Sequence, residues 1–135
     1  MDKVLEKKLY DKYPGLLKGF TLSPVQSCLA FGCEHGDGWY VIIENLLSVI
    51  ENHLVNKNRG KTDKEDIMVV TVDQIKEKFG GLRFYFSGGD EYVSGAVSMA
   101  ENISYHICEH CGSTKNVTQT KGWIKSLCEE CIKEK

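Results

Sequence analysis

The segment Ile75-Lys-Glu-Lys-Phe-Gly-Gly-Leu-Arg-Phe-Tyr-Phe86 predicts a β-hairpin in the middle of the chain. Two short alternating runs flank Gly80-Gly81, which is the pattern of two strands joined by a two-residue glycine turn. In this register one face is apolar and carries Ile75, Phe79, Leu82, Phe84 and Phe86. The other face is polar and carries Lys76, Lys78, Arg83 and Tyr85. The alternative for residues 74–79 is a short helix capped by Asp73 and stopped by Gly80; the hairpin is favoured over it.

Helical periodicity on both sides of the hairpin predicts three helices, near residues 3–13, 39–55 and 90–106. The clearest is the second, where one apolar stripe runs from Trp39 to Leu54. Residues 67–72 are rich in β-branched side chains and predict a further strand, and a short strand is expected around Cys28–Phe31. Residues 56–66 read as a polar surface loop. Together these elements predict an α+β fold, with helices packed on a small, mostly antiparallel sheet.

Two cysteine pairs near the C-terminus, Cys108-Glu-His-Cys111 and Cys128-Glu-Glu-Cys131, predict a metal site. Sixteen residues separate the pairs, including a hairpin with Gly122 near its turn, and four thiolates complete the tetrahedral shell of a structural Zn²⁺. A redox motif needs only one pair, and disulfides need an oxidising compartment. We therefore predict a core at 1–106 and a zinc ribbon at 107–135 that continues directly from the preceding helix. His110 is an alternative ligand inside the first pair.

Composition and charge narrow the class of protein. The chain has 135 residues, of which 41% are hydrophobic and 27% are charged, as in an ordinary globular domain. The formal net charge of −2 argues against a dedicated nucleic-acid binder, although it leaves room for a local basic patch. No transmembrane segment or signal peptide is evident, so a reducing cytoplasm is the expected compartment, and no membrane partner is expected.

Two further groups of residues are candidate sites. The polar hairpin face, with Lys76, Lys78, Arg83 and Tyr85, is a candidate partner-binding surface; the alternative is a solvated face that prevents edge pairing. Cys33, His35, Asp37 and Trp39 are a candidate pocket at the start of the second helix. The alternative there is that Asp37 caps the helix and Trp39 packs in the core. Cys28, Cys33 and His35 are also weighed as a second metal site, against buried free thiols.

Three motifs in this chain resemble an uncharacterised family of small proteins found in phages, prophages and bacteria. The motifs are Gly36-Asp-Gly-Trp39, Lys76-Glu-Lys-Phe-Gly-Gly-Leu-Arg-Phe-Tyr85, and the cysteine pairs with Gly122-Trp123 between them. The resemblance spans roughly residues 32–131. It implies a cytoplasmic, phage-encoded protein that ends in a zinc ribbon, and it implies no activity.

The expected function is that of a non-enzymatic binding module with a protein partner, for which an inhibitor of a host defence system is one specific form. No Ser-His-Asp order, phosphate-binding glycine loop or Glu-x-x-His motif is present to suggest catalysis. Two alternatives remain. One is a small-ligand or nucleotide binder, or an enzyme, that uses the region of Cys33, His35, Asp37 and Trp39. The other is a nucleic-acid-binding zinc ribbon.

Overall fold

The predicted hairpin forms the centre of a three-stranded sheet in the computed structural model, which describes residues 1–134. Its strands are β1 (Cys33–Glu34), β2 (Val70–Lys78) and β3 (Gly81–Gly88), in that spatial order. β2 and β3 are antiparallel over their whole length, whereas the two-residue β1 pairs in parallel with β2. The α+β fold and the mostly antiparallel sheet are therefore confirmed. Residues 74–79 lie in or directly after a strand, so the helical alternative is wrong.

The hairpin turn lies one residue earlier than predicted. Lys78 pairs with Gly81, so the two turn residues are Phe79 and Gly80, and both have positive φ angles, 54° and 84°. Gly81 belongs to β3, where a Cβ would lie 2.3 Å from the ring of Tyr105. Because of this shift, Phe79 does not reach the buried face as predicted. Its side chain is 67% exposed.

A β-bulge makes β2 one continuous strand where two were predicted. The register shifts between Val72 and Gln74, which leaves Asp73 as the extra residue. Because side chains alternate between faces, an uninterrupted strand would place Val72 and Ile75 on opposite sides of the sheet. With the bulge, Val70, Val72 and Ile75 are all buried on the same face.

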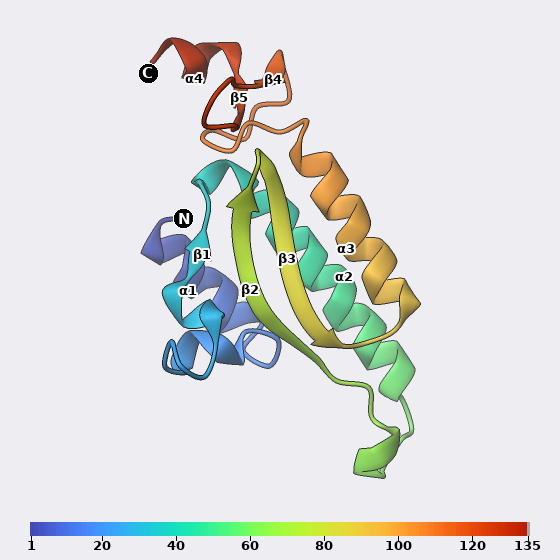
Figure 1. Cartoon of the computed structure of the whole chain (residues 1–135). Helices are drawn as coiled ribbons and strands as arrows, with labels where there is room; N and C mark the ends of the chain where they lie inside the picture. The colour runs from blue at the N-terminus through green and yellow to red at the C-terminus, as the bar shows by residue number, and fades with distance from the viewer. Residues whose placement is uncertain (135) are drawn as a thin grey trace.

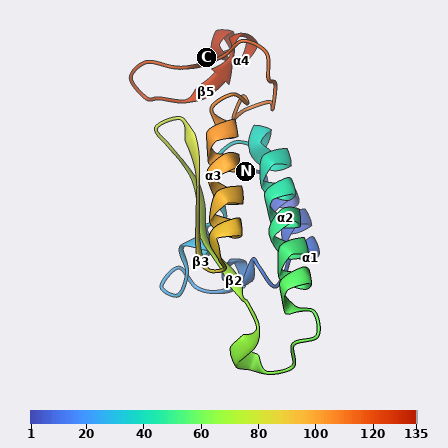
Figure 2. The same cartoon turned by 90° about the vertical axis from the view of Figure 1, so that its right-hand side faces the viewer.

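The three long helices are α1 (Lys3–Lys12), α2 (Tyr40–Asn58) and α3 (Glu91–Ser104). α2 extends further than predicted, and the Asn58 side chain ends it by bonding both the N–H and the C=O of Met68. Figures 1 and 2 show α2 and α3 side by side on one side of the sheet, with the opposite face uncovered. The main core lies between these layers. Its largest fully buried side chains include Trp39, Leu9, Leu29, Ile43, Leu47, Ile50, Ile75 and Leu82.

Helix α3 also protects the free edge of β3. The N–H groups of Leu82 and Phe84 point away from β2, and they donate to the Ser104 hydroxyl and the Glu101 carboxylate, both at 2.9 Å. An unpaired strand edge is a template for aggregation, so these side chains replace the missing neighbour strand. The hairpin is thereby fixed to α3, the helix that leads into the cysteine-rich segment.

The N-terminal region differs in two respects from the sequence-based interpretation. Residues 28–31 form a 3₁₀ turn, and the short strand follows at Cys33–Glu34. In α1 the apolar residue Val4 is exposed, whereas the charged residue Glu6 is buried. The Glu6 carboxylate accepts a hydrogen bond of 2.7 Å from the Cys33 N–H and pairs with Lys3, so a buried acid anchors the start of β1.

Candidate metal centre and its junction with the core

The C-terminal segment forms a small ribbon at one end of the molecule (Figure 1). It consists of β4 (Val117–Gln119), β5 (Ser126–Cys128) and the short helix α4 (Glu129–Lys133). β4 and β5 are antiparallel, and Gly122, with φ of 76°, lies in the connection between them. The buried residues of this part are few: Cys108, Leu127, Cys128 and Cys131 form a hydrophobic cluster separate from the main core. So small a cluster needs another source of stability.

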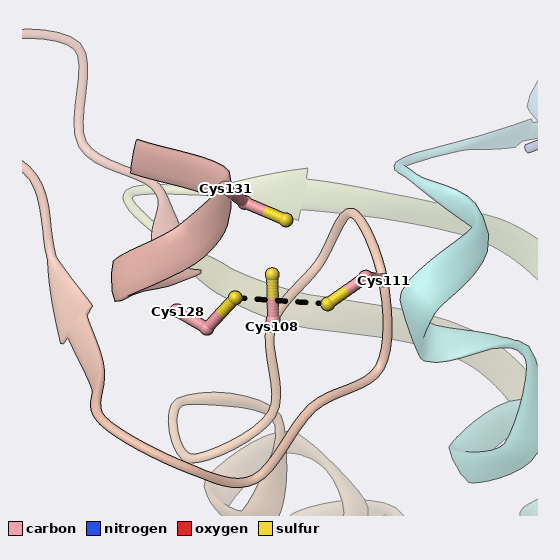
Figure 3. Close-up of side chains that lie close together, drawn as sticks. All are labelled: Cys108, Cys111, Cys128 and Cys131. Carbon is pink, nitrogen blue, oxygen red and sulfur yellow. Dashed lines mark hydrogen bonds between the residues drawn. The ribbon is translucent and has the colours of Figure 1, made fainter. Parts of the chain in front are cut away.

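Four thiols converge at the centre of this ribbon (Figure 3). The sulfur atoms of Cys108, Cys111, Cys128 and Cys131 all lie within 4.8 Å of one another, and those of Cys111 and Cys128 are 3.6 Å apart. A tetrahedron with metal–sulfur bonds of about 2.3 Å, the length typical of zinc, has edges of about 3.8 Å. The arrangement is compatible with one metal ion, and all four predicted ligands belong to it.

Backbone N–H groups around the first cysteine pair favour the thiolate form, which is the form that binds a cation. Burial acts to raise the pKa of Cys108, but hydrogen bonds from the N–H groups of Cys128, Cys111 and His110 lower it to about 6. Burial and the neighbouring thiols instead raise the pKa of Cys131. Cys108 thus favours the thiolate form, whereas the neighbouring thiols resist a second negative charge. A divalent cation bound among the four sulfur atoms would remove this conflict.

The first cysteine turn docks on the residues Gly36-Asp37-Gly38, which explains the two glycines. The Gly38 N–H donates to the Glu109 carbonyl at 2.7 Å, and the Gly36 N–H donates to the Glu109 carboxylate at 2.9 Å. A Cβ on Gly38 would lie 2.1 Å from the Cys108 carbonyl oxygen, and one on Gly36 would lie 2.4 Å from that of Glu109. Only hydrogen side chains permit so close an approach.

Polar contacts complete this junction. The indole N–H of the fully buried Trp39 donates to the Ile107 carbonyl at 3.0 Å. The Lys125 ammonium lies 3.2 Å from Glu109 and 3.3 Å from Glu77, which links the ribbon to the tip of the β2–β3 hairpin. These two carboxylates hold the Lys125 side chain in place. The ribbon is therefore attached to the core through Gly38, Trp39 and Lys125.

The residues predicted as a pocket have separate roles. Cys33, His35 and Trp39 are buried, whereas Asp37 is exposed and accepts a hydrogen bond from the Asp2 N–H. No side chain caps α2, so Asp37 is not its helix cap either. A pocket of about 530 Å³ beside the ribbon is lined by His35 but not by the other three. The four side chains do not share one cavity.

The protonation states in this region oppose thiol catalysis. Burial raises the pKa of Cys33 to about 12 and lowers the pKa of His35 to about 4. The His35 Nδ1 lies 2.7 Å from the Gly36 carbonyl oxygen, which can only accept, so Nδ1 carries the proton. A nucleophilic thiol requires the reverse, a lowered cysteine pKa beside a proton-accepting histidine. Within residues 1–134, the side chains grouped closely enough to ligate a metal include none of Cys28, Cys33 and His35, and Cys28 is exposed.

The predicted polar face of the hairpin is opposite the face that carries the buried Ile75, Leu82 and Phe84, and Figure 2 shows α2 and α3 on one side of the sheet only. Lys76 and Arg83 are directly opposite each other on β2 and β3, and Gln74 is opposite Tyr85. Lys78 and Tyr85 are exposed, whereas Lys76 and Arg83 are half-buried. Arg83 donates to the Tyr105 hydroxyl at 3.3 Å. Glu34 on β1 is the neighbour of Lys76 on its other side.

Two surface features were missed by the sequence reasoning. Phe79 and Trp123 are exposed aromatic residues at the ends of the two hairpins, with Trp123 80% exposed. An apolar groove of about 730 Å³ also lies between α2 and α3. Its exposed apolar side chains are Val41, Val49, Tyr92, Met99 and Ile103. Periodicity identifies the most regular apolar stripe of a helix, and Val41, Val49 and Met99 lie outside the predicted stripes.

Comparison with known proteins gives no relative from which a function can be transferred: no protein-family model, no curated protein and no solved structure matches this chain. None of the helices in residues 1–134 has the length and apolar character needed to cross a bilayer. The functional argument therefore rests on the geometry of this chain alone.

Proposed function

We propose that this protein is a non-enzymatic binding module for a protein partner, clamped by one structural Zn²⁺. The four-sulfur donor set supports zinc, because a closed shell of thiolates suits this ion and leaves no position for a catalytic water. The metal then stabilises a ribbon that has only a minimal core of its own. Partner recognition belongs to other surfaces of the molecule.

The observation that carries the proposed function is the uncovered apolar groove between α2 and α3. Val41 and Met99 are each 66% exposed, and Tyr92 is 56% exposed, although all three are large apolar residues in one groove. Contiguous apolar patches on a monomer mark binding surfaces more often than chance placement does. None of residues 1–134 covers this one; Figure 2 shows both helices unobstructed.

The shape and charge of the groove favour an amphipathic helix of the partner. Tyr92 and Ile103 are separated by three helical turns, about 16 Å, which matches the apolar stripe of a short helix. Among residues 1–134, Glu91 is the one charged side chain that lines the groove, since Glu44 pairs with Lys12 and Glu101 accepts from the Phe84 N–H. This negative charge favours a partner helix with basic flanks over a second copy of the same surface.

The resemblance to phage and prophage proteins suggests a specific form of this function. In this form the protein is an inhibitor whose α2–α3 groove binds and blocks a helix of a host defence protein. This form of the proposal depends on the sequence motifs alone. The host cytoplasm would then be its compartment.

A pair of synthetic helical peptides tests the groove. Both carry the same leucine stripe, but one has lysine flanks and the other has glutamate flanks, and binding is measured by fluorescence anisotropy. We expect the lysine peptide to bind at least ten-fold more tightly, and Val41→Glu with Met99→Glu to weaken it at least ten-fold. Val4→Glu with Val25→Glu is the matched control, because both valines are exposed outside the groove. Equal binding of the two peptides, or equal loss in the control, would refute the proposal, as would sedimentation data showing a dimer that the groove variants abolish.

A further inference from the structure

Phe79 combines two unfavourable features. Its φ of 54° places an aromatic residue in the left-handed region, at a turn position where asparagine or glycine is preferred. Its ring is also 67% exposed, and the Lys78 ammonium lies 5.6 Å from the ring centroid. Strained, exposed residues persist where a ligand uses them.

Trp123 is a second exposed aromatic residue on the adjoining hairpin. The two hairpin ends touch each other, because Gly80 packs against Ile124 and its carbonyl accepts a 2.6 Å hydrogen bond from the Ser126 hydroxyl. Phe79 and Trp123 directly precede Gly80 and Ile124, so the two rings extend from neighbouring turns. The Lys125 bridge to Glu77 and Glu109 and the metal site hold these turns in place. The result is a pair of aromatic side chains on a fixed support.

Cations surround the two rings. Lys78 lies over Phe79, and Lys121 is exposed two residues before Trp123. Further along the same sheet face, Lys76 and Arg83 are directly opposite each other, an arrangement of like charges that destabilises a strand pair unless an anion binds there. The carboxylates around this pair have other partners: Glu101, which lies near Arg83, accepts from the Phe84 N–H, and Glu34, the neighbour of Lys76, accepts from Gln74.

We propose that the two hairpin ends and the adjoining sheet face bind single-stranded nucleic acid, with bases stacked on Phe79 and Trp123 and phosphates on Lys76, Lys78, Arg83 and Lys121. Exposed aromatic rings beside a track of cations are the usual means of binding single strands without sequence preference. In a duplex the neighbouring base pairs cover the faces that stack, so duplexes are bound more weakly. The net charge of the whole chain does not oppose this, because the cations are concentrated on one face. This site is distinct from the α2–α3 groove and adds a second ligand class to the proposed function.

The test uses the full metal-loaded chain and a fluorescein-labelled fifteen-nucleotide oligo-dT, with a duplex of equal length for comparison. We expect Phe79→Asn and Trp123→Gln each to weaken single-strand binding at least about five-fold, the low end for one stacked base. Asparagine tolerates the left-handed turn, so the first variant keeps the hairpin. Phe31→Gln is the matched control, because Phe31 is exposed and lies in the 3₁₀ turn away from the hairpin ends. Lys76→Glu with Arg83→Glu should reduce the dependence of affinity on salt by about half.

Several results would overturn this inference: no oligo-dT binding, tighter binding of the duplex, or an equal loss in Phe31→Gln. Binding that depends on Lys76 and Arg83 but not on the two rings would also overturn it, because an anion site without stacking would then suffice. Val41→Glu with Met99→Glu, which tests the groove, should leave oligo-dT binding unchanged. Failure of one proposal is therefore distinguishable from failure of the other.

Discussion

Replacement of Gly38 by alanine should separate the ribbon from the core. The added Cβ would lie 2.1 Å from the Cys108 carbonyl oxygen and 2.5 Å from the Gly112 nitrogen, both of them backbone atoms that cannot rotate away. The φ angle of Gly38 is not positive, so alanine can adopt its backbone conformation and only the contact is affected. Overpacking of this kind costs about 1–3 kcal/mol. If the shift also breaks the bond from the Trp39 indole N–H to Ile107, a buried donor is left unpaired at a further cost of about 1–3 kcal/mol.

The measurement is thermal unfolding together with hydrogen exchange. We expect Gly38→Ala to lower the free energy of unfolding by about 2–4 kcal/mol, which corresponds to a decrease in Tm of roughly 10 °C for a chain of this size. Exchange should increase first at residues 36–38 and 107–112. Gly95→Ala is the matched control, because Gly95 lies within α3 and a Cβ there meets nothing within 4 Å. It should gain about 0.5–1 kcal/mol from helix propensity. If Gly38→Ala unfolds at the wild-type temperature, the junction does not depend on close backbone contact and our account of the two glycines is wrong.

Two further predictions concern the metal and the buried histidine. Metal analysis should return one zinc per chain. A chelator should remove the hydrogen-exchange protection of β4 and β5 while β2 stays protected, because the main core does not include the ribbon. Equal loss of protection in both sheets would contradict this. NMR should find His35 neutral, with its proton on Nδ1, and with a pKa of about 4 because of burial. The unfolded chain then binds more protons than the folded chain between pH 4 and about 6.5. The burial of neutral His35 therefore contributes up to about 3 kcal/mol to the free energy of unfolding above this window, and this contribution is lost as the pH falls through it. A His35 pKa of 6 or above would contradict the assignment.

Local patterns in the sequence were sufficient for the elements and the ligands. Helical periodicity located α2 and α3, and the β-branched and alternating runs located β2 and β3. The spacing of the two cysteine pairs identified all four thiols of the candidate metal site, because a Cys-x-x-Cys turn brings its two thiols together through local geometry alone. Such features depend on residues that are near one another in the chain.

Predictions failed where distant residues determine the outcome. The turn at Phe79-Gly80 could not be located by counting glycines, because Gly81 is required by the ring of Tyr105, which directly follows α3. The buried state of Glu6 follows from its bond to Cys33, and the bulge at Asp73 follows from the common core that Val72 and Ile75 both enter. None of these contacts leaves a periodic signal.

The sequence by itself therefore determined the α+β class, the strongest helices and the four-thiol site, since each depends on spacing within a short segment. Only the tertiary structure decided that Gly36 and Gly38 receive the first cysteine turn, that Phe79 and Trp123 extend from adjoining hairpin ends, and that α2 and α3 leave an apolar groove. The physical reason is that close approach and exposure are properties of pairs of surfaces, and these pairs are formed only when segments far apart in the chain pack together.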